Sequence, residues 1–148
     1  MYLALLHTHN LTRWIVLIAA VAALVLALVG RFGKQPFGKQ HRIANLAFVA
    51  SMDLQLVLGL LLYFVSPLVR AGLSDMGAAM SDAALRFFVV EHAFYMVVAV
   101  ALAHVGSVMV RKAADDRAKH TRTLVWFGLA LIVVLAGIPW QRALFPGA

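Results

Sequence analysis

Four long apolar segments, separated by short polar connections, set the pattern of this sequence. They extend over residues 12–30, 43–65, 87–110 and 121–138. A helix needs about 20 apolar residues to cross the roughly 30 Å of hydrocarbon in a bilayer. Lipid offers no hydrogen-bond partner to open backbone groups, so such segments are satisfied only as helices. The pattern predicts an all-α integral membrane protein in which residues 1–148 form a single transmembrane four-helix bundle.

Composition supports the membrane interpretation and excludes several kinds of site. The chain is 64% hydrophobic and 13% charged, whereas soluble domains are about half apolar and about a quarter charged. The excess apolar surface requires lipid around it. The sequence has no cysteine, which excludes disulfides, thiolate metal sites and thiol nucleophiles. No basic residue precedes Arg13, so we expect the first apolar segment to be a retained helix and not a signal peptide.

The basic residues predict how the helices are oriented. Nine of the 13 Lys and Arg residues lie in two short connections. The first connection holds Arg31, Lys34, Lys39 and Arg42, and the second holds Arg111, Lys112, Arg117, Lys119 and Arg122. The remaining four are Arg13, Arg70, Arg86 and Arg142. The positive-inside rule places both connections in the cytoplasm. We therefore expect two transmembrane hairpins with both termini non-cytoplasmic, and a lipid bilayer, not nucleic acid, as the partner of this charge.

Caps and turns are predicted around the helices. Asn10 and Thr12 are candidate caps of the first helix. The segment 69–86 lies outside, where Gly72 is expected in a turn and Ser81-Asp82 in a cap of the third helix.

Ionisable side chains inside the apolar segments are the candidate functional residues. Asp53, Glu91, His92 and His104 all lie within predicted spans. Such a group costs at least ~2.5–3.5 kcal/mol at the centre of a membrane helix, so it usually marks a site.

The outer end of the predicted bundle collects residues suited to haem. His7 and His9 lie near the start of the first helix, and His92 lies at the start of the third. Two imidazoles from different helices form an axial pair for haem iron, and we predict His9 and His92 as the metal ligands. Arg13 suits a haem propionate, and Glu91 either orients a histidine or pairs with Arg13, Arg86 or Arg142. Alternatively, these histidines are interfacial and the arginines extend to the lipid headgroups.

His104 is a separate case. It follows His92 by 12 residues, which is about 18 Å along a helix and about 120° around it. The residue at its depth on the second helix is Asp53, so a buried hydrogen-bonded pair or a step in a proton or quinone path is expected. His41 and His120 lie in the basic connections and are expected to be solvated.

Short motifs along the chain resemble one family. They are Leu6-His7-Thr8-His9 with Arg13-Trp14, Gln55-Leu56 with Gly59-Leu60, Tyr63 to Pro67, Arg86-Phe87 with Glu91-His92, and Ile138-Pro139-Trp140. Together they are similar to small bacterial four-helix membrane proteins commonly labelled cytochrome b. The resemblance implies haem b held in the bundle and respiratory electron transfer in the bacterial inner membrane. In that family the second helix tends to carry a histidine just before the glutamine, where this chain has Asp53-Leu54-Gln55. That departure removes the natural partner of His104.

Three functions are consistent with these observations. The first is a b-type cytochrome with at least one haem, bound by His9 and His92, that exchanges electrons with quinone or with other respiratory subunits. The second is a cofactor-free accessory subunit of a respiratory or photosynthetic complex, with polar side chains that join helices. The third is a haem-dependent, quinone-linked oxidoreductase acting on a small species at the outer face. No catalytic residue is assigned.

Overall fold

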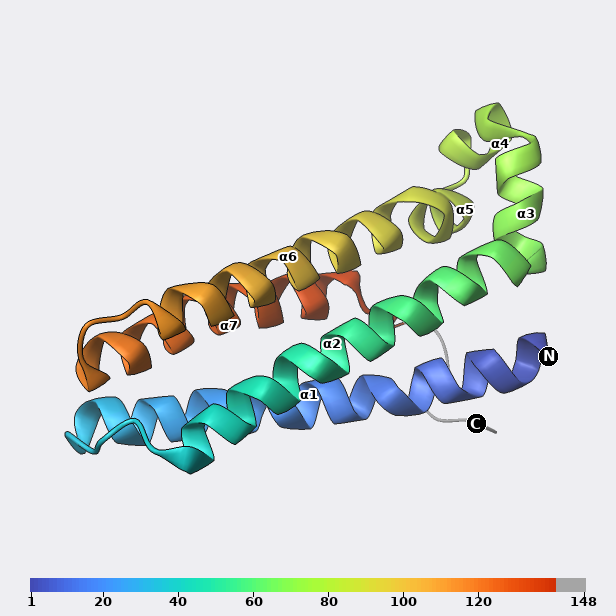
Figure 1. Cartoon of the computed structure of the whole chain (residues 1–148). Coiled ribbons are helices and arrows are strands. Elements are labelled where there is room, and N and C mark those ends of the chain that lie inside the picture. The colour runs from blue at the N-terminus through green and yellow to red at the C-terminus, as the bar shows by residue number, and fades with distance from the viewer. Residues whose placement is uncertain (141–148) are drawn as a thin grey trace.

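The computed structural model describes residues 1–140, so Arg142 lies outside the described residues. Within this range the chain is helical and contains no strand. In chain order the elements are α1 (Tyr2–Phe32), α2 (Lys39–Val65), α3 (Pro67–Ser74), α4 (Met76–Ser81), α5 (Ala83–Arg86), the π-helix η1 (Phe87–Glu91), α6 (His92–Arg111) and α7 (Asp116–Gly137). The elements α5, η1 and α6 follow one another directly, so they form one long helix (Figure 1).

Four of these helices are long and apolar enough to cross a membrane, as the sequence predicts: α1, α2, the helix over residues 83–111, and α7. The first begins at Tyr2 and not near residue 12. The predicted caps are wrong because the hydroxyl of Thr12 lies 3.0 Å from the carbonyl oxygen of Thr8, inside the helix. His7 and His9 therefore belong to α1 itself.

Two short helices, α3 and α4, form the connection between α2 and the third long helix, which begins with α5. The N-termini of α3, α4 and α5 are capped by Ser66, Asp75 and Asp82, whose side chains accept hydrogen bonds from backbone N–H groups. The cap predicted at Asp82 is confirmed. The turn predicted at Gly72 is wrong, since this glycine lies within α3. A Cβ there would lie 2.5 Å from Cγ2 of Val89, so the glycine lets α3 pack closely on η1.

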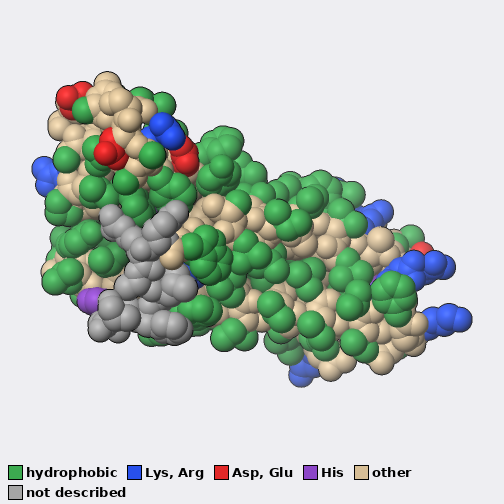
Figure 2. Space-filling model, turned by 180° about the vertical axis from the view of Figure 1, so that it is seen from behind, with side chains coloured by type: hydrophobic (Ala, Val, Ile, Leu, Met, Phe, Trp, Pro, Cys, Tyr) green, Lys and Arg blue, Asp and Glu red, His purple; other side chains and the backbone are tan. Residues whose placement is uncertain are grey.

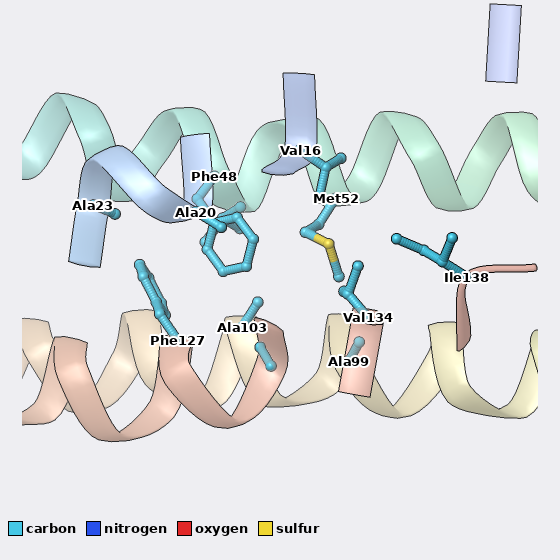
Figure 3. Close-up of a cluster of buried hydrophobic side chains, with 12 residues drawn as sticks. Val16, Ala20, Ala23, Phe48, Met52, Ala99, Ala103, Phe127, Val134 and Ile138 are labelled. Atoms are coloured by element: carbon cyan, nitrogen blue, oxygen red, sulfur yellow. The ribbon is translucent and has the colours of Figure 1, made fainter. Parts of the chain in front are cut away.

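The core of the bundle joins all four long helices (Figure 3). Ala20 of α1, Phe48 of α2, Ala103 of α6 and Phe127 of α7 have no exposed surface. The rings of Phe48 and Phe127 meet edge to face, with centres 4.9 Å apart. In a bilayer, helices associate through close packing because lipid is as apolar as the side chains, and small residues allow that approach. Alanines at the contact positions therefore decide how near the helices lie.

The two basic connections lie together at one end of the bundle. Nε of Arg31 donates to Oγ1 of Thr121 over 3.0 Å, and the His120 ring bonds the carbonyl oxygen of Gln35. Figure 2 shows Lys and Arg side chains gathered at the end far from α3 to α5, with an apolar surface between the ends. The expected solvation of His41 and His120 is wrong, because these rings pack on Phe37 and are only 3% and 1% exposed.

Candidate functional site

A cavity of about 370 Å³ lies at the end of the bundle that carries α3. Its walls come from all four long helices and include the predicted residues His7, His9, Arg13 and His92. Its volume falls within the roughly 300–1,000 Å³ of small-molecule and cofactor sites. A smaller hollow of about 70 Å³ between α2 and α6 also has His9 and His92 in its wall. The structure thus brings four of the seven predicted site residues to one place.

His9 of α1 and His92 of α6 lie edge to face in the wall of this cavity. Their ring centres are 6.3 Å apart and their planes are inclined by 73°. Metal–imidazole bonds are about 2.0–2.1 Å long for zinc and an imidazole nitrogen lies roughly 1.1 Å from the ring centre, so two imidazoles on opposite sides of one ion have centres about 6 Å apart. His9 and His92 are therefore near enough that both could hold one metal ion.

The end of α7 orients His92. Nδ1 of His92 lies 2.7 Å from the carbonyl oxygen of Gly137, the last residue of α7. The last carbonyls of a helix lack partners inside it, so this one is available to a neighbouring donor. Because a carbonyl only accepts, Nδ1 carries the proton and Nε2 is the nitrogen that can bind a metal. Histidine ligands almost always donate their other N–H in this way.

Glycine at position 137 allows this close approach of α7 to α6. A Cβ at this position would lie 2.9 Å from Cβ of Tyr95 and 2.4 Å from Cε of Met96. The first contact involves an atom attached directly to the backbone, so a side-chain rotation does not relieve it. A larger residue would move the carbonyl away from His92.

The side-chain amide of Gln55 on α2 contacts both the ring and the backbone of His9. Its amide Nε2 donates to the carbonyl oxygen of His9 over 3.0 Å and lies 3.3 Å from Nε2 of the His9 ring. Its Oε1 accepts a hydrogen bond from the hydroxyl of Thr12. The remaining ring nitrogen of His9, Nδ1, is buried and has no hydrogen-bond partner among residues 1–140. An amide nitrogen only donates, so Nε2 of His9 is the acceptor and Nδ1 carries the proton. A buried N–H without a partner is uncommon.

The π-helix η1 leads directly into His92, and the sequence pattern did not reveal it. Such single π-turns occur frequently at functional sites. The hydroxyl of Tyr63 on α2 donates to the carbonyl oxygen of Val89 in this turn over 2.8 Å. The only signal in the sequence is a tyrosine at membrane depth. It does not say which backbone group the hydroxyl meets.

Glu91 and Arg13 occupy different positions around the site. Glu91 pairs with Arg86, with Oε1 and Nε 2.7 Å apart, and both side chains are more than a third exposed. Of the two roles expected for Glu91 the structure therefore places it in the ion pair, while the Gly137 carbonyl orients His92. Arg13 is only 8% exposed, lines the cavity, and has its guanidinium 5.8 Å from the centre of the Trp14 ring.

Asp53 and His104 lie apart from the cavity. Oδ1 of Asp53 is 2.7 Å from Nε2 of His104, which confirms that the two residues pair. The expected burial is wrong, because the two side chains are 48% and 52% exposed on the outer surface where α2 meets α6. Neither residue lines the cavity or the smaller hollow.

Comparison with known proteins identifies no relative. No family model matches the sequence, no curated protein matches it, and no solved structure matches the fold. The resemblance to cytochrome b-like membrane proteins stays a prediction.

Proposed function

We propose that this protein is a membrane b-type cytochrome that holds one haem b between His9 and His92 and carries electrons in a respiratory chain. The observation that supports the proposal best is the pair of imidazoles at 6.3 Å in the wall of a cavity. Bis-imidazole ligation between facing helices is an established way to hold haem in a helical bundle.

The residues around the pair fit such a group. Nε2 of His92 has its lone pair available because Nδ1 is bonded to the Gly137 carbonyl. The lone pair of His9 is on Nε2, because the Gln55 amide beside it only donates, and this nitrogen would bind iron in place of that amide. Arg13 lines the same cavity and supplies positive charge for a propionate. Apolar side chains complete the wall, among them Val16, Met52, Met96 and Ile138.

Haem supplies reversible one-electron chemistry when it is bound. The chain contributes position and surroundings. The Gly137 carbonyl orients His92, and the Gln55 amide bonds the backbone carbonyl of His9, so both residues that would hold the haem are kept in place. The apolar wall excludes water and lowers the local dielectric, and burial of this kind is one of the terms that set a haem potential.

We also propose an orientation and an electron partner. The end that carries the basic connections lies in the cytoplasm according to the positive-inside rule, so both termini and the cavity lie toward the outer face of the bacterial inner membrane. A cavity at this depth is within reach of lipid-soluble molecules. A quinone is therefore the electron partner that we favour.

The test is a visible spectrum of the purified protein, reduced minus oxidised, after expression in haem-replete bacteria. We expect Soret and α bands of a low-spin b-type haem at one haem per chain. His92→Ala and His9→Ala should each abolish these low-spin bands, because each removes one axial ligand. His104→Gln is the matched control, since it replaces another membrane histidine outside the cavity and keeps a hydrogen-bond donor for Asp53, and it should keep the full spectrum.

Two results would overturn the proposal. One is an intact, helical protein from these cells with no haem bands, which would favour a cofactor-free accessory subunit. The other is an unchanged spectrum in His92→Ala, which would show that haem binds elsewhere. If haem binds as proposed, turnover of a small oxidant with quinol would add the enzyme function to that of a carrier.

A further inference from the structure

A hydrogen-bonded pair of a carboxylate and an imidazole lies on the outer surface of the bundle at membrane depth. Asp53 lies near the middle of α2, which extends over Lys39–Val65, and His104 lies within the apolar part of α6. Their side chains are about half exposed although they bond to each other. The pair therefore presents polar atoms outward, to whatever covers the junction of α2 and α6.

Lipid is a poor cover for this pair. Ionisable residues within membrane helices almost always face the bundle interior or a water-filled cavity, because hydrocarbon does not solvate them. The outer faces of the other two helices differ, since Ile18, Val25, Leu129 and Ile132 are exposed there and are all apolar. Among the described residues the α2–α6 face thus differs in chemistry from the lipid-facing surface of α1 and α7.

We propose that a second copy of this chain covers the α2–α6 face, so that the protein is a twofold dimer. A twofold interface presents the same patch from each copy and must be self-complementary. A patch with one carboxylate and one imidazole meets this condition, because rotation about an axis through the pair sets each Asp53 against the His104 of the other copy. Each group then gains a second hydrogen-bonding partner.

The side chains beside the pair allow such an approach. Ala50 lies one turn from Asp53 on α2, Ala101 lies one turn from His104 on α6, and both are exposed. Small residues at helix contacts let backbones come close enough for interhelical hydrogen bonds. Val57 and Val97, each 54% exposed, lie further along the same helix faces and extend the contact. A single polar position in an otherwise apolar helix seam also fixes the register of association.

The absence of cysteine from the sequence allows a direct test. Ala101→Cys places one thiol on the proposed interface. Ala22→Cys is the matched control, an exposed alanine on α1 that lies ten residues before the end of its helix at the basic end, as Ala101 does on α6. Each variant is oxidised with copper phenanthroline in proteoliposomes at low protein density. We expect disulfide-linked dimers of Ala101→Cys at several times the yield of Ala22→Cys.

A second measurement examines the pair itself without relying on the cross-link. Asp53→Leu with His104→Leu replaces both polar groups by apolar ones, so no isolated charge is left in lipid. Energy transfer between labelled copies over a range of protein-to-lipid ratios gives the dimer dissociation constant. Each interhelical hydrogen bond in a membrane protein changes an equilibrium by roughly threefold, so loss of two contacts should raise this constant about tenfold.

The outcomes either support the dimer or overturn it. Cross-linking of both cysteines to the same extent indicates random collision and refutes the proposed face. A wild-type chain that stays monomeric at every density refutes the second copy, and leaves a different membrane protein as the cover of the pair. An unchanged dissociation constant in the double leucine variant shows that a dimer, if present, forms through another face. None of these results depends on haem.

Discussion

The sharpest test of the packing concerns Gly106, where α6 meets α7. A methyl group at this position would lie 2.5 Å from Cβ of Trp126 and 3.1 Å from two ring atoms of Phe127. Carbon atoms in contact prefer about 3.5–4.0 Å, so the methyl of Gly106→Ala would be too close to Trp126 by about 1 Å. Cβ of Trp126 is attached to the backbone and Phe127 has no exposed surface, so neither side chain can rotate away.

The magnitude follows from a comparison with Gly128, a second helical glycine. A Cβ at Gly128 would meet no atom within 4 Å. Both changes to alanine gain helix propensity of roughly 0.8–1.0 kcal/mol, so this term cancels in the comparison. Overpacking of a tight contact typically costs about 1–3 kcal/mol. We therefore expect Gly106→Ala to have a free energy of unfolding about 1–3 kcal/mol below that of Gly128→Ala.

Far-UV circular dichroism during unfolding by sodium dodecyl sulfate in mixed micelles provides the free energy of unfolding. This signal is preferred to fluorescence because Trp126 touches the altered position. Equal stability of the two variants would refute the reasoning, since it would mean that α6 and α7 do not approach closely at Gly106. A loss in Gly128→Ala equal to that in Gly106→Ala would point to a general intolerance of the helices and not to this contact.

Two further predictions concern the ends of the bundle. Gln55→Leu removes the amide that joins α2 to α1, and interhelical hydrogen bonds in membranes contribute about 0.6 kcal/mol, with a maximum near 1.7 kcal/mol. A double-mutant cycle with Thr12→Val should therefore give a coupling free energy in this range. Zero coupling would show that the two side chains do not interact. Gly30→Ala puts a methyl 2.3 Å from Cε1 of the buried His120 ring, so we expect a loss of about 1–3 kcal/mol in unfolding free energy. A second change, His120→Ala, should recover part of that loss, and an additive effect of the two changes would contradict the contact.

The sequence alone predicts the membrane helices and their number. Whether a segment inserts into the bilayer depends on the summed hydropathy of its own residues and not on its contacts with other helices. For the same reason the sequence singles out His9, His92, Asp53 and His104, because an ionisable group in an apolar segment stands out locally. It errs at the start of α1, since the polar residues His7 to Thr12 lower the hydropathy there although the backbone stays helical.

The partners of these residues could not be predicted from the sequence. Three arginines were candidates for Glu91, and the π-turn, which places Glu91 five residues after Arg86, brings these two side chains together. The group that orients His92 is the backbone carbonyl of Gly137. Every residue has such a carbonyl, so the sequence does not indicate which one meets His92. The π-turn at Phe87–Glu91 likewise has no signature in the apolar sequence that forms it.

What the sequence by itself determined is which segments lie in lipid and which polar residues lie with them. The tertiary structure decided which of those residues meet: His9 meets His92 in the wall of a cavity, while Asp53 and His104 meet on the outside of the bundle. The physical reason is that depth in a membrane depends on position along a helix, whereas contact depends on rotation about its axis and on the small residues that set the distance between helices. In this chain the rotation of each residue about its helix axis places His9 and His92 at a candidate haem site inside the bundle and Asp53 and His104 at a candidate interface outside it.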